Sequence, residues 1–151
     1  MKFLVVLFMI FCCNGATSAD PGLKSKQSLT IDIVNSSENV VSRSLPIARD
    51  GLKGIVLQTM QYTSQYLEEL GINNRCTENL HNPGSPKIEI SILAIERASN
   101  SEKHIAYSYT IKHNDSVLFQ EDDRSQDDNF DEICRKIGKK IASTAKSILD
   151  H

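Results

Sequence analysis

The chain has 151 residues, with 17 basic and 19 acidic side chains and a formal net charge of −2. It has no concentrated run of Lys or Arg, so it lacks the electrostatic signature of a nucleic-acid-binding protein. Tryptophan is absent and aromatic residues make up 6% of the chain, which argues against a surface that stacks on bases or sugars.

Residues 1–19 have the layout of a secretory signal peptide. Lys2 supplies a basic start, residues 3–13 form a short apolar run, and small residues follow at Thr17 and Ala19. A membrane-spanning helix needs about 20 apolar residues, roughly twice the length of this run. We therefore expect cleavage after Ala19 and export of the remaining chain.

Two cysteines near the start, Cys12 and Cys13, raise the alternative of a lipid anchor. Bacterial lipoproteins are cleaved just before a cysteine that is then acylated, and their signal needs a small residue at the preceding position. Here Phe11 precedes Cys12, and Cys12 precedes Cys13. The match is poor, so cleavage at the later point is favoured, and it removes both cysteines.

Residues 20–26 are polar, contain a Pro-Gly pair and are expected to form a flexible lead-in. Residues 27–151 then fit a single domain. Its first element is a strand at Gln27–Asn35, where polar and apolar residues alternate. The apolar residues that share one side of this strand are Leu29, Ile31 and Ile33.

The next stretch, Ser36–Arg49, has no regular pattern and is expected to be a long connection, with room for a short edge strand at Asn39–Ser42. A helix follows at Asp50–Leu70, because apolar residues recur there at intervals of three and four. Gly71 supplies the left-handed residue that commonly ends a helix.

Three strands are predicted in the second half of the domain, after a loop at Asn73–Ser85. They are Lys87–Arg97, Lys103–Lys112 and Ser116–Asp122, joined by short polar turns. In each of them every second residue is apolar, which is the period that places side chains on one face of a strand.

The acidic stretch Glu121–Glu132 leads into a final helix. It also has oxygen-bearing side chains at the spacing of a calcium loop, but Gln126 stands where an EF-hand needs glycine, so an ordinary acidic loop is favoured. The predicted buried stripe of the helix is Phe130, Ile133, Cys134, Ile137, Ile141, Ala145, Ile148 and Leu149.

The order strand, helix, three strands, helix predicts an α+β fold. We expect a two-layer sandwich in which two helices cover one face of a four-stranded, mainly antiparallel sheet. The opposite face has small residues at its centre and is a candidate surface for another protein, although plain solvent is the alternative. The residues assigned to this candidate partner face are Thr30, Asp32, Glu89, Ser91, His104, Ala106, Ser108 and Thr110.

Two cysteines, Cys76 and Cys134, remain after the predicted cleavage. An exported protein meets oxidising conditions, so we expect a disulfide between them, with roughly 4 kcal/mol of chain-entropy stabilisation. The alternatives are two buried thiols or a bond to a partner chain. Neither cysteine has a second Cys or His at the spacing of a zinc site.

No catalytic or cofactor-binding motif is present, so we expect neither an enzyme activity nor a cofactor or metal. The phosphate-binding glycine loop, the nucleophile elbow and the zinc-binding helix motif are all missing, and the four histidines are scattered. Asn35 and Asn114 match the N-glycosylation pattern, and in a chain rich in Asn and Ser two such matches are near chance.

The order of elements over Gln27–Leu149 resembles small bacterial cell-envelope domains, namely those of curli-secretion lipoproteins and the amino-terminal domain of TolB. The resemblance implies a periplasmic or outer-membrane assembly component that binds other proteins of an envelope complex. A secreted binding protein, either an inhibitor or a host-directed factor, is the alternative. A hydrolase with an unrecognised site is less favoured.

Overall fold

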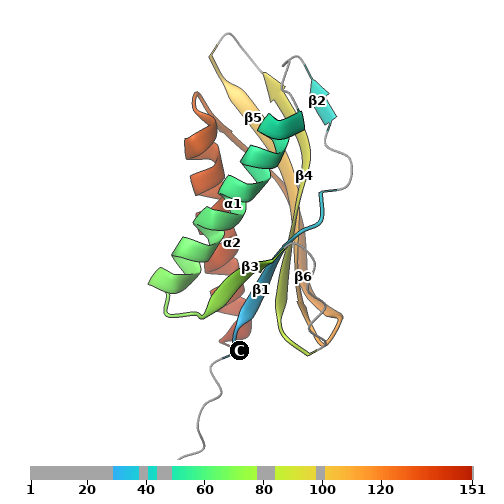
Figure 1. Ribbon diagram of the computed structural model, residues 1–151, viewed down its shortest axis with the longest axis vertical. Coiled ribbons are helices and arrows are strands. Elements are labelled where there is room, and N and C mark those ends of the chain that lie inside the picture. The colour runs from blue at the N-terminus through green and yellow to red at the C-terminus, as the bar shows by residue number, and fades with distance from the viewer. Residues whose placement is uncertain (1–28, 38–40, 44–48, 78–83, 98–100, 151) are drawn as a thin grey trace, which may run out of the picture.

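The computed structural model describes residues 29–37, 41–43, 49–77, 84–97 and 101–150. Its described part has two layers, a twisted sheet and a pair of helices that lie side by side on one face of it (Figure 1). The predicted signal peptide and lead-in, residues 1–26, lie outside the described residues.

The described residues form two strands, a helix, four strands and a final helix, in that order along the chain. The strands are β1 (Ile31–Asn35), β2 (Val41–Arg43), β3 (Asn74–Thr77), β4 (Lys87–Arg97), β5 (Lys103–His113) and β6 (Ser116–Asp127), and the helices are α1 (Arg49–Glu69) and α2 (Phe130–Leu149).

Among the described residues the sheet has six strands instead of the four expected, with the order β3-β1-β4-β5-β6 and β2 paired to β4. It is also mixed and not mainly antiparallel. β1 pairs in parallel with both β3 and β4, and β2 pairs in parallel with β4, while β4, β5 and β6 form the expected antiparallel meander. The α+β class and the helices on one face are confirmed.

The parallel pairing follows from the path of the chain. β1 and β2 both run parallel to β4, and α1 carries the chain back along the sheet, so the strand that follows it runs in the same direction as β1. This strand is β3, which lies within the stretch expected to be a loop. Its sequence, Asn-Arg-Cys-Thr, has no apolar alternation, and its pairing depends on the free edge that β1 offers.

The two-residue turn between β5 and β6 fixes the register of the meander. Asn114 and Asp115 both have positive φ, 51° and 61°, which is the geometry of a type I′ hairpin. A bulge between Ile92 and Ala94 inserts Leu93 into β4 and leaves it 41% exposed. These features keep the apolar residues of β4 and β5 in line on the face toward the helices.

α1 ends as the sequence predicts, at a left-handed glycine. Gly71 has φ of 77°, its amide donates to the Glu68 carbonyl at 2.9 Å, and the Ile72 amide donates to the Leu67 carbonyl at 2.8 Å. This pair of bonds is a Schellman motif, which satisfies the last carbonyls of the helix. It also turns the chain directly into β3.

α2 starts at an asparagine cap. The Asn129 side chain accepts a hydrogen bond from the Asp131 amide at 3.0 Å, and acidic side chains at Asp131 and Glu132 complement the positive end of the helix. The predicted stripe is confirmed at its centre, where Ile133, Ile137 and Ile141 are fully buried. In the described part of the chain, no helix combines the length and apolar character that crossing a membrane requires.

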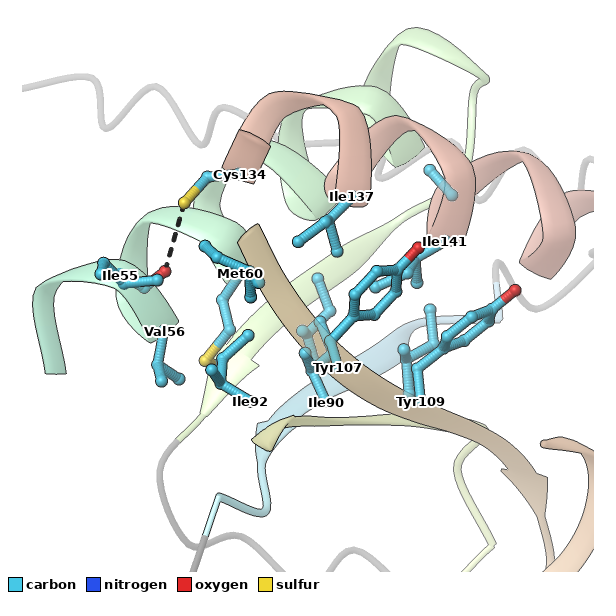
Figure 2. Packing of buried hydrophobic residues seen from close by; sticks show 14 of the residues in the cluster. Ile55, Val56, Met60, Ile90, Ile92, Tyr107, Tyr109, Cys134, Ile137 and Ile141 are labelled. Atoms are coloured by element: carbon cyan, nitrogen blue, oxygen red, sulfur yellow. Dashed lines mark hydrogen bonds between the residues drawn. The ribbon is translucent and has the colours of Figure 1, made fainter. Parts of the chain in front are cut away.

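The core lies between the sheet and the two helices. Figure 2 shows Ile90, Ile92 and Tyr107 from the strands packed beneath Ile137 of α2 and beside Met60 of α1. The burial of one isoleucine of this kind contributes about 1.5–3 kcal/mol relative to its exposure. Leu29 was expected to join this face, but it precedes β1 and is 50% exposed.

Candidate functional site

The outer face of the sheet, defined as the face away from the helices, carries most of the predicted partner face. The β4–β5 register places Glu89 beside Thr110 and Ser91 beside Ser108, and it brings His104 next to Glu96. Ala106 lies between these pairs, opposite Ala94. Six of the eight predicted residues are therefore neighbours on two strands, and the centre of this surface is small and uncharged.

The other two predicted residues do not join these six. Thr30 precedes the first residue of β1 and is not part of the β4–β5 pairing. Asp32 is completely buried, because the Arg75 side chain from β3 closes over it with two hydrogen bonds, 2.5 Å from Nε and 3.1 Å from Nη2. The sequence missed this because β3 itself was not expected.

Ion pairs surround the centre of the outer face. The Lys112 ammonium lies 2.7 Å from the Glu89 carboxylate, and Arg124 on β6 pairs with Glu96 on β4. Charges that are already paired within the protein lose less solvation when a second surface covers them. The outer face therefore has small side chains at its centre and ion pairs at its rim, with Asp122 exposed beside Ser108.

His104 is the best-placed candidate for acid–base chemistry, and its surroundings do not support that role. Its Nε2 atom is buried and has no hydrogen-bond partner among the described residues. The nearest carboxylate oxygen, Glu102 Oε1, lies 3.8 Å away, beyond hydrogen-bonding distance. No serine, threonine or cysteine hydrogen-bonds to His104 in the described part of the chain.

A polar network joins β5 and β6 to α2 on the face toward the helices. The Tyr107 hydroxyl donates to Asp123 at 2.9 Å, the Tyr109 hydroxyl donates to Glu121 at 2.7 Å, and the Lys140 ammonium donates to both carboxylates at 2.9 Å or less. The network forms because β6 continues to Asp127, five residues past its predicted end. The carboxylates of the supposed acidic loop therefore belong to a strand.

Each group in this network keeps one protonation state at neutral pH, which suits a structural role. The Lys140 ammonium lowers the pKa of both Glu121 and Asp123, so both stay ionised at neutral pH. Burial, followed by hydrogen bonding to Asp123, raises the pKa of Tyr107, and burial raises the pKa of Tyr109 to about 12. Both tyrosines are therefore neutral donors that tie the edge of the sheet to α2.

Calcium binding by this stretch has no support in the geometry. Successive side chains of β6 point to opposite faces of the sheet, so they cannot converge on one ion as a loop does. Within the described residues, no group of three or more His, Cys, Asp or Glu side chains is placed to hold a metal ion.

The two cysteines do not form the expected disulfide in this structure. Both are free, and each thiol contacts a different carbonyl of α1 at 3.7 Å, that of Met60 for Cys76 and that of Ile55 for Cys134 (Figure 2 shows the second). Cys76 is an exposed residue whose thiol is partly desolvated, and Cys134 is buried; desolvation raises the pKa of both thiols, which makes them poor nucleophiles.

We expect the purified protein, unfolded without reductant, to be alkylated by iodoacetamide at both Cys76 and Cys134. Peptide mass spectrometry identifies the two modified positions and separates them from the cysteines near the start of the chain. The folded protein serves as the control, in which Cys134 is protected because it is fully buried. A requirement for reductant before Cys76 and Cys134 react would contradict the free-thiol assignment.

One small pocket adjoins α1 near the end of β1. It has a volume of about 270 Å³, and the described residues that line it are Asn35, Lys53, Leu57 and Met60. Sites for small molecules generally enclose about 300–1,000 Å³ and converge several polar groups on the ligand. This pocket is smaller than that range and carries no such arrangement among the described residues.

No protein-family model and no curated protein matches the sequence. Among solved structures, the fold is similar to that of a PelC dodecamer from Paraburkholderia phytofirmans, with a TM-score of 0.54 at 9% identity, covering 78% of this chain and 86% of the other. A second PelC dodecamer structure from the same organism gives a TM-score of 0.52 at 10% identity, over 77% and 87% of the two chains.

A protein from Xanthomonas campestris that matches the DUF330 family model is also similar, with a TM-score of 0.55, 9% identity and coverage of 82% of this chain and 88% of the other. At these identities the likeness concerns the fold alone. The predicted resemblance to small α+β domains of bacterial proteins is confirmed at that level, and the chain shares its architecture with the PelC and Xanthomonas proteins.

Proposed function

We propose that this protein is a non-catalytic, exported component of the bacterial cell envelope that binds other proteins through the outer face of its sheet. The observation that carries the proposal is the placement of both helices on one face, which leaves the small side chains at the centre of the other face uncovered by them.

The chemistry of the outer face supports contact with a protein layer. Ser91, Ala106 and Ser108 project little from the strands, so another backbone can approach closely. Two ion pairs at its rim, Lys112 with Glu89 and Arg124 with Glu96, are already formed within the sheet. Asp122, beside Ser108, is exposed, so a partner that covers this surface must supply a polar or basic group there.

The similarity to PelC supports the idea of a subunit in an assembly. The PelC structures are dodecamers, so a domain of this architecture can serve as a subunit of a larger assembly. An assembly or scaffold role in the periplasm or at the outer membrane also agrees with the predicted signal peptide. We propose protein partners of this kind, without a role for nucleic acid or a cofactor.

A photo-crosslinking amino acid in place of Ser108 tests the proposal in intact cells of the native host. Ser108 lies at the centre of the outer face, between Ser91 and Asp122. We expect irradiation to give a discrete higher-mass adduct with an envelope protein. The matched control places the same amino acid at Gln61, an exposed position on α1, where no adduct is expected.

Both variants must unfold at the temperature of the parent protein, so that a difference in crosslinking reports on the surface. Absence of an adduct at Ser108, or equal adducts at Ser108 and Gln61, would overturn the outer face as the binding surface. Accumulation of a freely soluble monomer in the culture medium would instead favour the secreted binding protein.

A further inference from the structure

β6 forms one edge of the sheet and offers an unusually long free strand. It has 12 residues and pairs only with β5 within the described part of the chain (Figure 1). The opposite edge, β3, has 4 residues. An exposed edge strand carries a row of backbone donors and acceptors that another strand can pair with, and native proteins usually shorten or block such edges.

One side-chain contact shows which backbone groups point away from β5. The Gln126 carbonyl accepts a hydrogen bond from the Lys136 ammonium at 3.1 Å. Backbone groups of successive residues in an antiparallel strand alternate between its two sides. The amides and carbonyls of Gln120 and Asp122 therefore point to the open edge as well.

The two ends of this edge differ. At the Gln126 end, Lys136 lies over the edge, also binding Asp127 at 2.6 Å, and limits the approach of another strand. At the other end, Val117 and Leu118 are 55% and 47% exposed. The open window is therefore the stretch from Leu118 to Arg124, with an apolar start and no lysine covering it.

The charge of the window selects a basic partner. Glu121 and Asp123 point toward the helices and share Lys140, which offsets one of their two negative charges. Asp122 points to the outer face, is exposed, and its side chain makes no hydrogen bond or ion pair with the described residues. Two copies of β6 paired antiparallel about this point would set acidic side chains against each other, which is unfavourable.

We propose that the β6 edge binds an extended segment of a partner protein that pairs with the backbone from Leu118 to Arg124. The segment carries Lys or Arg opposite Asp122 and an apolar residue next to Leu118. This inference rests on the proposed function, because it assigns a second contact to the same protein-binding role. It is the strand-addition mode of recognition, in which backbone hydrogen bonds give affinity and flanking side chains give specificity.

A fluorescent nine-residue peptide of alternating lysine and valine tests the edge on the purified full-length protein. We expect saturable binding that slows hydrogen exchange of the Gln120 and Asp122 amides at least tenfold. A glutamate–valine peptide of the same length is expected to bind at least tenfold more weakly, since it places like charge beside Asp122.

Gln120→Pro separates strand pairing from simple charge attraction. Proline removes the outward amide of Gln120 and is tolerated on an edge strand, because that amide makes no bond to β5. We expect peptide affinity to fall at least tenfold at unchanged net charge. Asp122→Lys, an exposed substitution, is expected to weaken the same peptide and to strengthen the glutamate–valine peptide. Unchanged thermal unfolding of both variants confirms that they remain folded.

Equal peptide binding by the parent protein and Gln120→Pro would overturn strand addition, since it would show attraction by charge alone. Failure of the peptide to bind at millimolar concentration would overturn it too. Neither result bears on crosslinking from Ser108, which lies on the outer face and reports on the proposed function separately.

Discussion

Replacement of Gly138 by alanine is expected to destabilise the protein by about 1–3 kcal/mol, because α2 has no room for a methyl group where it crosses α1. A Cβ atom at this position would lie 2.7 Å from Tyr62 Cβ and 2.8 Å from the Thr63 amide nitrogen. Neither atom can rotate aside, so the helices must separate. Separation would loosen the contacts of Ile137 and Ile141 with the sheet.

The matched control is Gly54→Ala on α1. A methyl group at Gly54 meets nothing within 4 Å, and glycine inside a helix costs about 0.5–1 kcal/mol relative to alanine. We therefore expect Gly54→Ala to stabilise the protein and Gly138→Ala to destabilise it, as measured by urea unfolding. A loss of stability in both variants, or in neither, would contradict the close packing of α1 against α2 at Gly138.

Stability is expected to fall steeply between pH 10 and pH 12, because the Tyr107, Tyr109 and Lys140 network binds its protons more tightly in the folded protein. Burial raises the pKa of Tyr109 to about 12, and burial with the Asp123 hydrogen bond raises the pKa of Tyr107 further. Burial alone would lower the pKa of Lys140, but hydrogen bonds to Asp123 and Glu121 raise it overall.

The direction of the change follows from proton linkage. A group whose pKa is higher in the folded than in the unfolded protein gives stability that is fully present below its unfolded value. That stability is lost as the pH rises toward the folded value. For a tyrosine the unfolded value is about 10, so the loss begins there. Tyrosinate absorbance should show Tyr107 and Tyr109 ionising only as the protein unfolds.

Urea unfolding at a series of pH values, with the double variant Tyr107→Phe and Tyr109→Phe, measures this contribution. We expect the variant to lose less than half as much stability as the parent over this range, with Lys140 supplying the remainder. Tyr66→Phe on α1 is the control and should follow the parent. An unchanged alkaline decline in the double variant would contradict the role of the two hydroxyl groups.

The meander and both helices were predictable because their signals are local. Ile88, Ile90 and Ile92 repeat every second residue and alternate with polar groups, so any sheet that buries one face must turn them inward. α1 ends at Gly71 for an equally local reason, since glycine accepts the left-handed conformation at little cost.

The candidate site was less predictable, because it depends on which strands become neighbours. Asp32 alternates with isoleucines and was expected on an open face, yet Arg75 covers it only because β3 pairs with β1. The same limit applies to Cys76 and Cys134. The sequence counts the thiols, but a disulfide needs a particular separation and orientation of the two backbones.

The full length of β6 is present in the sequence as a continued alternation. Glu121 and Asp123 continue the period that Phe119 begins, but their charge suggested a solvated loop. Lys140 and the tyrosine hydroxyls make the half-buried position of these two carboxylates beside α2 acceptable, since each ionised group has a partner there. Partners this distant in sequence give no local sign of their presence.

The sequence by itself determined the α+β class, the positions of the long elements and the apolar face that the helices cover, because periodicity and turn chemistry act over a few residues. Only the tertiary structure decided the parallel pairing of β1, the recruitment of β3 and the free edge of β6. Those features depend on the return path of the chain and on which backbone groups lack partners after the core has formed, and neither is encoded in any single segment.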